Sequence, residues 1–282
     1  ILEKKTGKKI SIDGKAIKSA TDKINNGNIP YIVSAFIGEI GLSIGEVKVD
    51  DKSNEITAIP ELLDLLDIEG ATITIDAIGT QEDIVNKIVN KGGHYVLPVK
   101  DNQRILKKEI KSQFDSYNNL LGNPEVFHKS TVDKDHGRIE EREYYLTYNT
   151  SKITDKEKWN TVNAVAYMRV TRTERDETTI TDNYYIIDNK IEIDKLIDAI
   201  RDHWNIECGL HWRLDVILDE DHSTNKVGNS IENLSIIRKI IFNLASLDNR
   251  FGKVPLQRKL TRYMLDFENI EKLIFEVIPS IS

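Results

Sequence analysis

Three acidic residues stand out in this sequence because each lies in an otherwise apolar or helical context. Asp13 ends the run ISID, Asp76 ends the run ITID, and Glu207 lies in a stretch with helical periodicity. Burying an unpaired charge is costly unless a metal ion or a partner group compensates it. Two acids at strand ends and one acid on a helix form a suitable ligand set for a metal-dependent enzyme that cuts phosphodiester bonds.

The two strand-end acids also have a simpler interpretation. An aspartate that ends a strand often forms a turn or caps a helix, and either Asp13 or Asp76 alone fits that role. If their strands are neighbours in one sheet, however, the two carboxylates can converge on one metal ion. The pair therefore favours a metal site more than either residue does alone.

Glu207 belongs to a polar stripe with a spacing of four residues, namely His203, Glu207, His211 and Asp215. Residues at this spacing share one face of a helix. The stripe is compatible with a solvated face, with a zinc site or with a carboxylate that binds a harder metal ion, although the HExxH pattern of zinc proteases is absent. Apolar neighbours predict that the helix is largely buried; they are Trp204, Ile206, Leu210, Trp212 and Leu214.

Two groups of basic and amide side chains suit a phosphate-rich partner. Lys100, Asn102 and Gln103 follow the strand-like run HYVLPV, and the segment DHGRIEER contributes His136, Arg138 and Arg142. Contacts from such groups to phosphates fix the register of a nucleic acid and make its affinity salt-dependent. Taken individually, a residue of this kind is more often an ordinary surface charge than a DNA ligand.

Composition limits the class of protein further. The chain has 282 residues, 39% of them hydrophobic, which is enough for one large domain or two modest domains. The net charge of −7 disfavours a protein that coats DNA generally, but it allows an enzyme with local basic groups. Cys208 is the single cysteine, so an internal disulfide is excluded and a reducing cytosol fits. No apolar run approaches the roughly 20 residues of a membrane span, and no signal peptide is visible.

The first hundred residues predict an α/β arrangement. The runs ISID, YIVSAFI and GLSIGEVKV predict a meander of three strands. A helix over ITAIPELLDLLDI, a strand over ATITIDAI, a helix over QEDIVNKIVNKGG and a strand over HYVLPVK follow. This strand–helix–strand order predicts that the last two strands pair in parallel.

The rest of the chain divides into a β-rich and a helical part. After a charged helix at RILKKEIKSQF, residues 104–188 predict a mostly antiparallel β segment. Two amphipathic helices follow, over DKLIDAIRDHWNIECGLHWRLDV and NSIENLSIIRKIIFNLASLD. The sequence closes with a basic tail that carries Arg250, Lys253, Arg258, Lys259 and Arg262.

With these residues in place, the sequence resembles the DDE-type insertion-sequence transposases of bacteria, in the H-repeat-associated (ISAs-type) group. The matching stretches include IDGKAIK at Asp13, ATITIDAIGTQ at Asp76, GGHYVLPVKDNQ, DHGRIEER, and HWNIECGLHWRLDVILDED around Glu207. The resemblance covers nearly the whole chain. Broader relatives carry Tyr, Arg and Lys around the helix glutamate, where this chain has Ile200, His203 and Leu214.

The resemblance implies a ribonuclease H-like core, a mixed five-stranded sheet with flanking helices, and an inserted antiparallel β-rich subdomain. It divides the chain into a first core part (1–103), the insertion (104–188) and a second core part with the helix of Glu207 and the basic tail (189–282). A short N-terminal helper domain that such proteins carry is expected to be missing. The implied metal ligands and catalytic residues are Asp13, Asp76 and Glu207, holding two Mg²⁺ or Mn²⁺ ions.

The implied partners are double-stranded DNA with terminal inverted repeats, target DNA and a second copy of the chain in a homodimer. No membrane and no small-molecule cofactor are expected, and the expected location is the cytoplasm, in association with the nucleoid. Residues expected to contact DNA are Lys100, Asn102, Gln103, Arg138, Arg142, His203 and His211. Two alternatives stay open: an inactive or domesticated DNA-binding remnant, and a metal-dependent nuclease without strand transfer.

Overall fold

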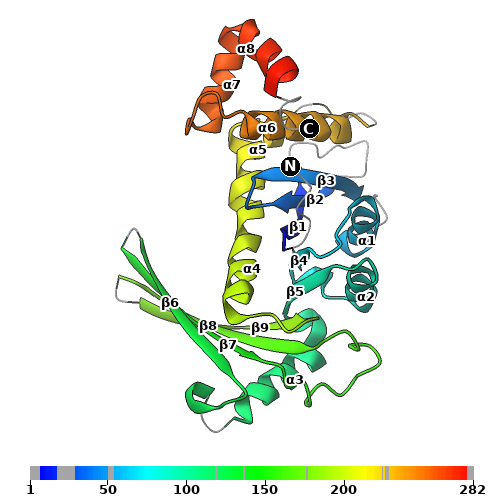
Figure 1. Cartoon of the computed structure of the whole chain (residues 1–282), viewed down its shortest axis with the longest axis vertical. Coiled ribbons are helices and arrows are strands. Elements are labelled where there is room, and N and C mark those ends of the chain that lie inside the picture. The colour runs from blue at the N-terminus through cyan, green and yellow to red at the C-terminus, as the bar shows by residue number, and fades with distance from the viewer. Residues whose placement is uncertain are drawn as a thin grey trace. The chain divides into compact units, whose positions relative to one another are not determined.

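The chain folds into two compact units, residues 1–67 with 202–282 and residues 68–201. The structure is a computed structural model, shown in Figure 1, and each unit is described by itself. It describes residues 7–17, 29–49, 54–117, 120–135, 137–175, 177–223, 225 and 229–277.

The first unit is built on an antiparallel meander of three strands. These are β1 (Lys9–Ala16), β2 (Tyr31–Ile37) and β3 (Leu42–Val49), with β2 in the middle. Gly41, with φ +66°, closes the turn between β2 and β3, where a side chain would strain the backbone. The predicted meander is confirmed.

Helix α1 (Glu55–Leu65) covers one face of this meander, as its apolar periodicity predicts. The helix begins at Asn54, whose side chain accepts a hydrogen bond from the backbone N–H of Ile56 at 3.0 Å. Gly45 on β3 lies directly under the helix, because a Cβ there would meet Leu62 at 3.1 Å. A glycine at this position therefore lets the helix approach the sheet closely.

The opposite face of the meander packs against the helix of Glu207 and against α6 (Ser230–Leu247). Phe36 on β2 forms a buried cluster with Leu210 and Phe242, among others. Lys239 on α6 pairs with Glu46 on β3, and both side chains are less than 10% exposed. Asn243 adds two hydrogen bonds to the backbone of Ser43, so α6 is fixed to the edge of β3.

The predicted basic tail forms a packed helical segment, α7 (Leu256–Leu265) and α8 (Phe267–Lys272), followed by a π-helical turn at Leu273–Val277. Its centre is the fully buried Asp248, which accepts hydrogen bonds from Arg250 and from the hydroxyl of Tyr263 at 2.7 Å. Lys259 is also buried and donates to the backbone carbonyls of Ala245 and Asp248. Two of the tail's basic side chains, Arg250 and Lys259, therefore form hydrogen bonds within the fold.

Replacing Asp248 with asparagine should lower the free energy of unfolding by about 2 kcal/mol at pH 6, and by almost nothing at pH 2. Burial alone would raise the pKa of Asp248, but hydrogen bonds from Arg250 and Tyr263 outweigh burial and lower that pKa to about 2. The carboxylate therefore stabilises the fold above its unfolded pKa near 3.8, and the contribution is lost as the pH falls toward 2. Urea denaturation of both proteins across this pH range measures the effect. An equal difference at both pH values would contradict it.

The second unit begins with a strand–helix–strand segment. Strand β4 (Thr72–Ile75) is followed by a 3₁₀ turn at Ala77–Gly79, helix α2 (Glu82–Asn90) and strand β5 (His94–Val99). Strands β4 and β5 pair in parallel, which confirms the prediction. Helix α2 buries its apolar face on β5 and ends where Gly92 adopts φ +74°.

Four longer strands complete the sheet of this unit, and all of them pair antiparallel. They are β6 (Phe127–Asp135), β7 (Arg138–Thr147), β8 (Ala164–Glu174) and β9 (Glu177–Ile187), and the order is β4-β5-β9-β8-β7-β6. Helix α3 (Arg104–Asp115) packs on β8 and β9, whereas side chains of α4 (Ile193–Asn205) such as Leu196 and Ile200 join the buried cluster of the sheet. The β-rich character predicted for residues 104–188 is confirmed, and their status as an insertion stays a prediction.

The architecture is therefore α/β, with parallel and antiparallel strand pairs (Figure 1). Of the described helices, none combines the length and the apolar character that crossing a membrane requires.

Candidate metal and DNA site

Asp76 lies directly after β4 and starts the 3₁₀ turn at Ala77–Gly79. Its Oδ1 accepts a hydrogen bond from the backbone N–H of Ile78 at 3.0 Å, so the residue caps the turn. The simpler interpretation of a strand-end aspartate is thus correct for one carboxylate oxygen. Oδ2 takes no hydrogen bond from the part of the chain that the structure describes, and Asp76 is half-buried. This oxygen is free to bind a cation.

The predicted DNA contacts Asn102 and Gln103 lie beside the loop of Asp76. Asn102 Nδ2 donates to the carbonyl oxygen of Ala77 at 2.6 Å, and Gln103 Nε2 donates to that of Thr80 at 2.9 Å. Both amides therefore bind protein backbone. Lys100, at the end of β5, is exposed and remains the better placed of the three to meet a phosphate.

Asp13 was predicted to end its strand, but it lies in the middle of β1, opposite Ser34 of β2, because Gly14 to Ala16 continue the pairing with β2. Its side chain is 19% exposed. Its Oδ2 is 3.5 Å from Nδ1 of His211, a nearly buried residue. Burial, together with the nearby Lys239, Lys15 and His203, lowers the pKa of His211 to about 3. At neutral pH the imidazole is therefore uncharged, and its contact with Asp13 is not an ion pair.

Glu207 lies in a π-helical segment, Ile206–His211, between α4 and the short helix α5 (Trp212–Val216). Such π-helical insertions occur frequently at functional sites. The segment contacts β1, so Asp13 and Glu207 come from elements that touch within one unit. Glu207 is exposed at the surface of this segment.

Two predictions about this helix are wrong. The helix predicted over residues 194–216 is not one continuous α-helix, because Ile206–His211 form a π-helical segment between α4 and α5. The helix is also less buried than its aromatic residues suggested, since Trp204 is 63% and Trp212 54% exposed. Among the five apolar neighbours named from the sequence, Ile206, Leu210 and Leu214 are the ones in the buried cluster.

Lys15, two residues after Asp13, is a charged group that the sequence reasoning missed. Its ammonium group pairs with Asp215 and with Glu220, the latter at 2.6 Å, and Asp221 lies 3.8 Å away. Glu220 is only 2% exposed. The ion pairs connect β1, which carries Asp13, to the segment that follows Glu207. A lysine two residues from a candidate ligand was the available signal in the sequence.

The donor chemistry of the three acids suits a hard divalent cation, since carboxylate oxygens are the ligands that Mg²⁺ and Mn²⁺ prefer. Asp13 and Glu207 belong to the first unit and Asp76 belongs to the second. Among the described residues, no group of three or more His, Cys, Asp or Glu side chains is arranged to hold a metal ion. The free oxygen of Asp76 and the contact between β1 and the π-helical segment are the observations that fit the metal.

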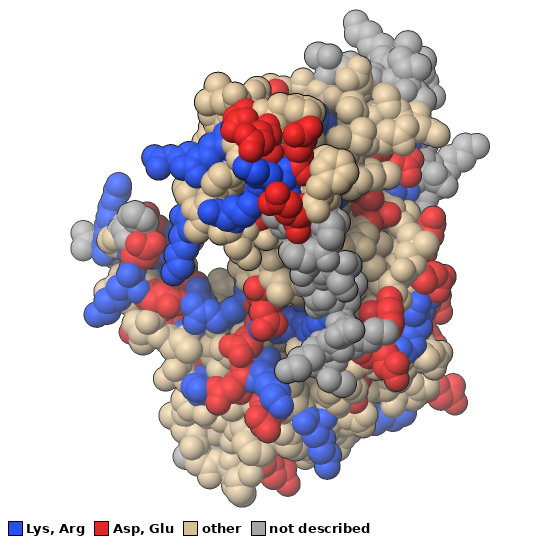
Figure 2. All heavy atoms as spheres, turned by 45° about the horizontal axis from the view of Figure 1, so that its top comes forward, with Lys and Arg blue, Asp and Glu red and all other residues tan. Residues whose placement is uncertain are grey.

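Two of the other predicted DNA-contacting side chains, Arg138 and Arg142, already lie next to carboxylates of the protein. Arg142 pairs with Asp133 and Glu140, and Arg138 lies 3.4 Å from Glu140, so both guanidinium groups face carboxylates. His136 lies outside the described residues. On the face shown in Figure 2, basic side chains are interspersed with acidic ones. A contact between DNA and Arg138, Arg142, His203 or His211 stays a prediction.

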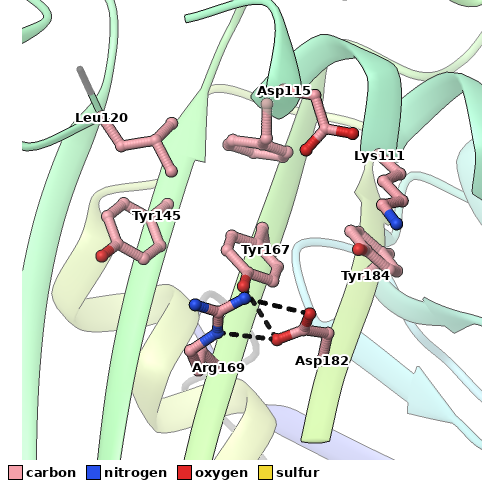
Figure 3. A pocket seen from close by; sticks show the side chains of 9 residues that line it. Lys111, Asp115, Leu120, Tyr145, Tyr167, Arg169, Asp182 and Tyr184 are labelled. Carbon is pink, nitrogen blue, oxygen red and sulfur yellow. Dashed lines mark hydrogen bonds and ion pairs between the residues drawn. The ribbon is translucent and has the colours of Figure 1, made fainter. Parts of the chain in front are cut away.

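Figure 3 shows a pocket of about 280 Å³ in the second unit, between α3 and the strands β7, β8 and β9. The rings of Tyr145, Tyr167 and Tyr184 stack along its floor with centroid distances of 5.4 Å. Arg169 binds both carboxylate oxygens of Asp182, which lowers the pKa of that acid. The Arg169–Asp182 pair is thus satisfied internally, and we assign this pocket no part in the chemistry.

Comparisons with known proteins give one consistent family for this chain. The family described as "Transposase DDE domain" matches residues 8–244, a range that contains Asp13, Asp76 and Glu207. The Escherichia coli (strain K12) protein "H repeat-associated putative transposase YhhI" is 38% identical over 262 residues, covering 91% of this chain and 68% of the relative. "Putative transposase YncI" of Escherichia coli O157:H7 is 37% identical over 272 residues, or 95% and 69% of the two chains.

A solved methyltransferase from Clostridium acetobutylicum ATCC 824 is 9% identical over 49% of this chain with a TM-score of 0.14, a likeness too weak to inform the fold. The sequence relatives, by contrast, are similar enough to assign the chain to a family. Fold and site define an α/β protein with carboxylates on adjoining strand and helix elements. This chain belongs to the DDE transposase family, in its H-repeat-associated group.

Proposed function

We propose that the chain catalyses cleavage and strand transfer of DNA at the ends of an insertion sequence. The observation that carries the proposal is the family match over residues 8–244, because it includes all three candidate acids. The contact between β1 and the π-helical segment supports it by bringing the elements of Asp13 and Glu207 together. The meander β1–β3 and the parallel pair β4–β5 would form the ribonuclease H-like core, and residues 104–188 the insertion.

In this proposal Asp13, Asp76 and Glu207 are the catalytic residues and hold two Mg²⁺ or Mn²⁺ ions. When bound, such ions generate a nucleophile from water and stabilise the charge on the departing oxygen. The protein contributes the carboxylates, and Asp76 presents Oδ2 while Oδ1 stays bound to the backbone of Ile78. His211, whose pKa burial lowers, lies 3.5 Å from Asp13 Oδ2.

The DNA substrate would be duplex with terminal inverted repeats, and the 3′-hydroxyl formed by cleavage would attack target DNA. The test is to incubate the protein with Mg²⁺, with labelled element ends and with a target plasmid. The expected products are nicks with a 3′-hydroxyl, followed by joined molecules. Nicks without joined molecules would assign a nuclease, and DNA binding with no nick would assign an inactive remnant. A homodimer and a nucleoid-associated location stay predictions.

Lys100 gives a separate prediction on DNA binding. Replacing it with methionine should weaken binding of all DNA sequences alike and reduce the slope of log affinity against log salt concentration by about 1. The expected change follows from the exposed position of Lys100 at the end of β5. Fluorescence anisotropy without divalent metal, at several salt concentrations, measures the slope.

The matched control is Lys107→Met, on the neighbouring helix. The ammonium group of Lys107 already pairs with Asp101 at 2.9 Å, so its removal should leave the salt slope unchanged. Equal slopes for the Lys100 variant and the wild type would remove Lys100 from the phosphate contacts.

A further inference from the structure

Two side-chain amides from another segment donate hydrogen bonds to the backbone of the loop that follows Asp76. Asn102 Nδ2 donates to Ala77 O at 2.6 Å, and Gln103 Nε2 donates to Thr80 O at 2.9 Å. Both donors come from the turn after β5, and both acceptors lie within four residues of Asp76. All of these residues belong to the second unit, and they lie at the ends of the two parallel strands β4 and β5.

The loop contributes bonds of its own that complete the arrangement. Thr80 is fully buried, and its Oγ1 donates to Pro98 O on β5 at 2.7 Å. Gln103 also reaches Gln81 Oε1 at 3.3 Å, and Gln81 Nε2 in turn donates to Ile78 O at 3.1 Å. Each backbone carbonyl that an amide binds is therefore part of the short turn that begins at the aspartate.

The conformation of this turn decides where the carboxylate of Asp76 lies. Within the turn, the N–H of Ile78 binds Asp76 Oδ1 at 3.0 Å and the N–H of Gly79 binds Asp76 O at 3.1 Å. If the turn opens, the N–H of Ile78 moves away and the carboxylate becomes free to rotate. A ligand that must be ordered when a metal ion arrives binds that ion less tightly.

We propose that Asn102 and Gln103 are positioning residues whose amides keep the Asp76 turn closed, so that one carboxylate oxygen stays directed outward. The inference rests on the proposed function in that Asp76 is taken as a metal ligand. It is an alternative to the expectation that these two amides contact DNA phosphates, because each amide nitrogen already donates to a backbone carbonyl.

Neutral amides suit this role for electrostatic reasons. A carboxylate at either position would face a carbonyl oxygen and repel it, and a lysine would place a positive charge beside a cation site. An amide donates to the carbonyl without changing the charge around Asp76. Neutral Asn and Gln at positions 102 and 103 therefore fit this role better than basic residues would.

The test uses the whole chain with the variants Asn102→Ala and Gln103→Met, alone and combined, which remove the donors without adding charge. The first readout is the rate of amide hydrogen exchange, which is measured by NMR in metal-free buffer. Exchange of the N–H groups of residues 78–81 should become about three- to tenfold faster in each single variant and faster still in the double variant. Ile105→Ala, at a side chain that is 72% exposed just beyond Gln103, should change nothing.

The second readout is Mn²⁺ binding, which is measured by electron paramagnetic resonance. The Mn²⁺ concentration for half-saturation should rise about three- to tenfold, and excess Mn²⁺ should restore the cleavage rate. DNA affinity without metal should keep the wild-type value and salt slope. This combination separates positioning from general damage, since a misfolded variant would not recover at high Mn²⁺.

Unchanged exchange at residues 78–81 in the double variant would overturn the inference. A lower salt slope with unchanged Mn²⁺ binding would also overturn it, in favour of phosphate contacts. If the wild type binds no Mn²⁺ and does not cut DNA, the proposed function fails, but the exchange rates still decide whether the amides hold the turn. The two failures are therefore distinguishable.

Discussion

Replacing Glu207 with glutamine should lower the rate of DNA cleavage on the order of 1,000-fold, because the loss of a carboxylate ligand removes several kcal/mol of charge stabilisation. A neutral amide is a much poorer ligand for Mg²⁺ than a carboxylate. Glu207 is exposed, so the free energy of unfolding should change by less than about 0.5 kcal/mol. Single-turnover cleavage of labelled element ends with Mg²⁺ measures the rate, and urea denaturation measures the stability.

The neighbouring residue provides the control for this experiment. Cys208 is exposed on the same π-helical segment, and Cys208→Ser should leave the cleavage rate unchanged. If Glu207→Gln cuts DNA at the wild-type rate while Asp13→Asn and Asp76→Asn do not, Glu207 is not the third ligand. The metal site would then have to draw its third carboxylate from elsewhere in the chain.

The regular elements were predictable wherever apolar residues recur with a clear period. The meander at 9–49, the helix α1 and the parallel pair β4–β5 follow directly from such patterns and from glycine positions. Strand β6 (Phe127–Asp135) was not identified individually, because most of its residues are exposed on both faces of the sheet. A strand stabilised mainly by backbone pairing leaves little trace in hydrophobic periodicity.

In the candidate site, too, features that depend on neighbouring residues could be predicted, whereas contacts between residues far apart in sequence could not. Asp13, Asp76 and Glu207 could be named from local context and from the family resemblance, and their role as metal ligands stays a prediction. The backbone partners of Asn102 and Gln103 lie over 20 residues away in sequence. Long-range pairings of this kind are set by the packing of strands and helices, so a sequence pattern alone does not reveal these backbone partners, and the predicted phosphate contacts stay a prediction.

Lys15 is the clearest case of a long-range contact, and its removal should have the largest effect on stability. The Lys15 side chain is 11% exposed, and its ammonium group binds Glu220 at 2.6 Å across 205 positions of sequence. Lys15→Met would leave the buried carboxylate of Glu220 without its cation. Breaking a buried ion pair in this way costs about 3–5 kcal/mol, which urea denaturation at pH 7 would detect.

Two further variants show whether the ion pair is the cause. Lys15→Met combined with Glu220→Gln should recover a large part of the lost stability, because the unpaired charge is gone. Lys195→Met is the matched control, since that side chain is 70% exposed and its removal should cost less than about 0.5 kcal/mol. No recovery in the double variant would mean that Lys15 stabilises the unit by packing rather than through the charge of Glu220.

The pH dependence supplies an independent check on the same group. Burial alone would lower the pKa of Lys15, but the carboxylates of Glu220 and Asp215 outweigh burial and raise it above the usual 10.5. The stabilising contribution is therefore complete below pH 10.5 and is lost as the pH rises through the higher pKa of the folded state. The wild type should lose stability in this alkaline range more steeply than Lys15→Met. Because the ion pair joins the strand of Asp13 to the segment after Glu207, its loss should also reduce cleavage at temperatures where both proteins remain folded.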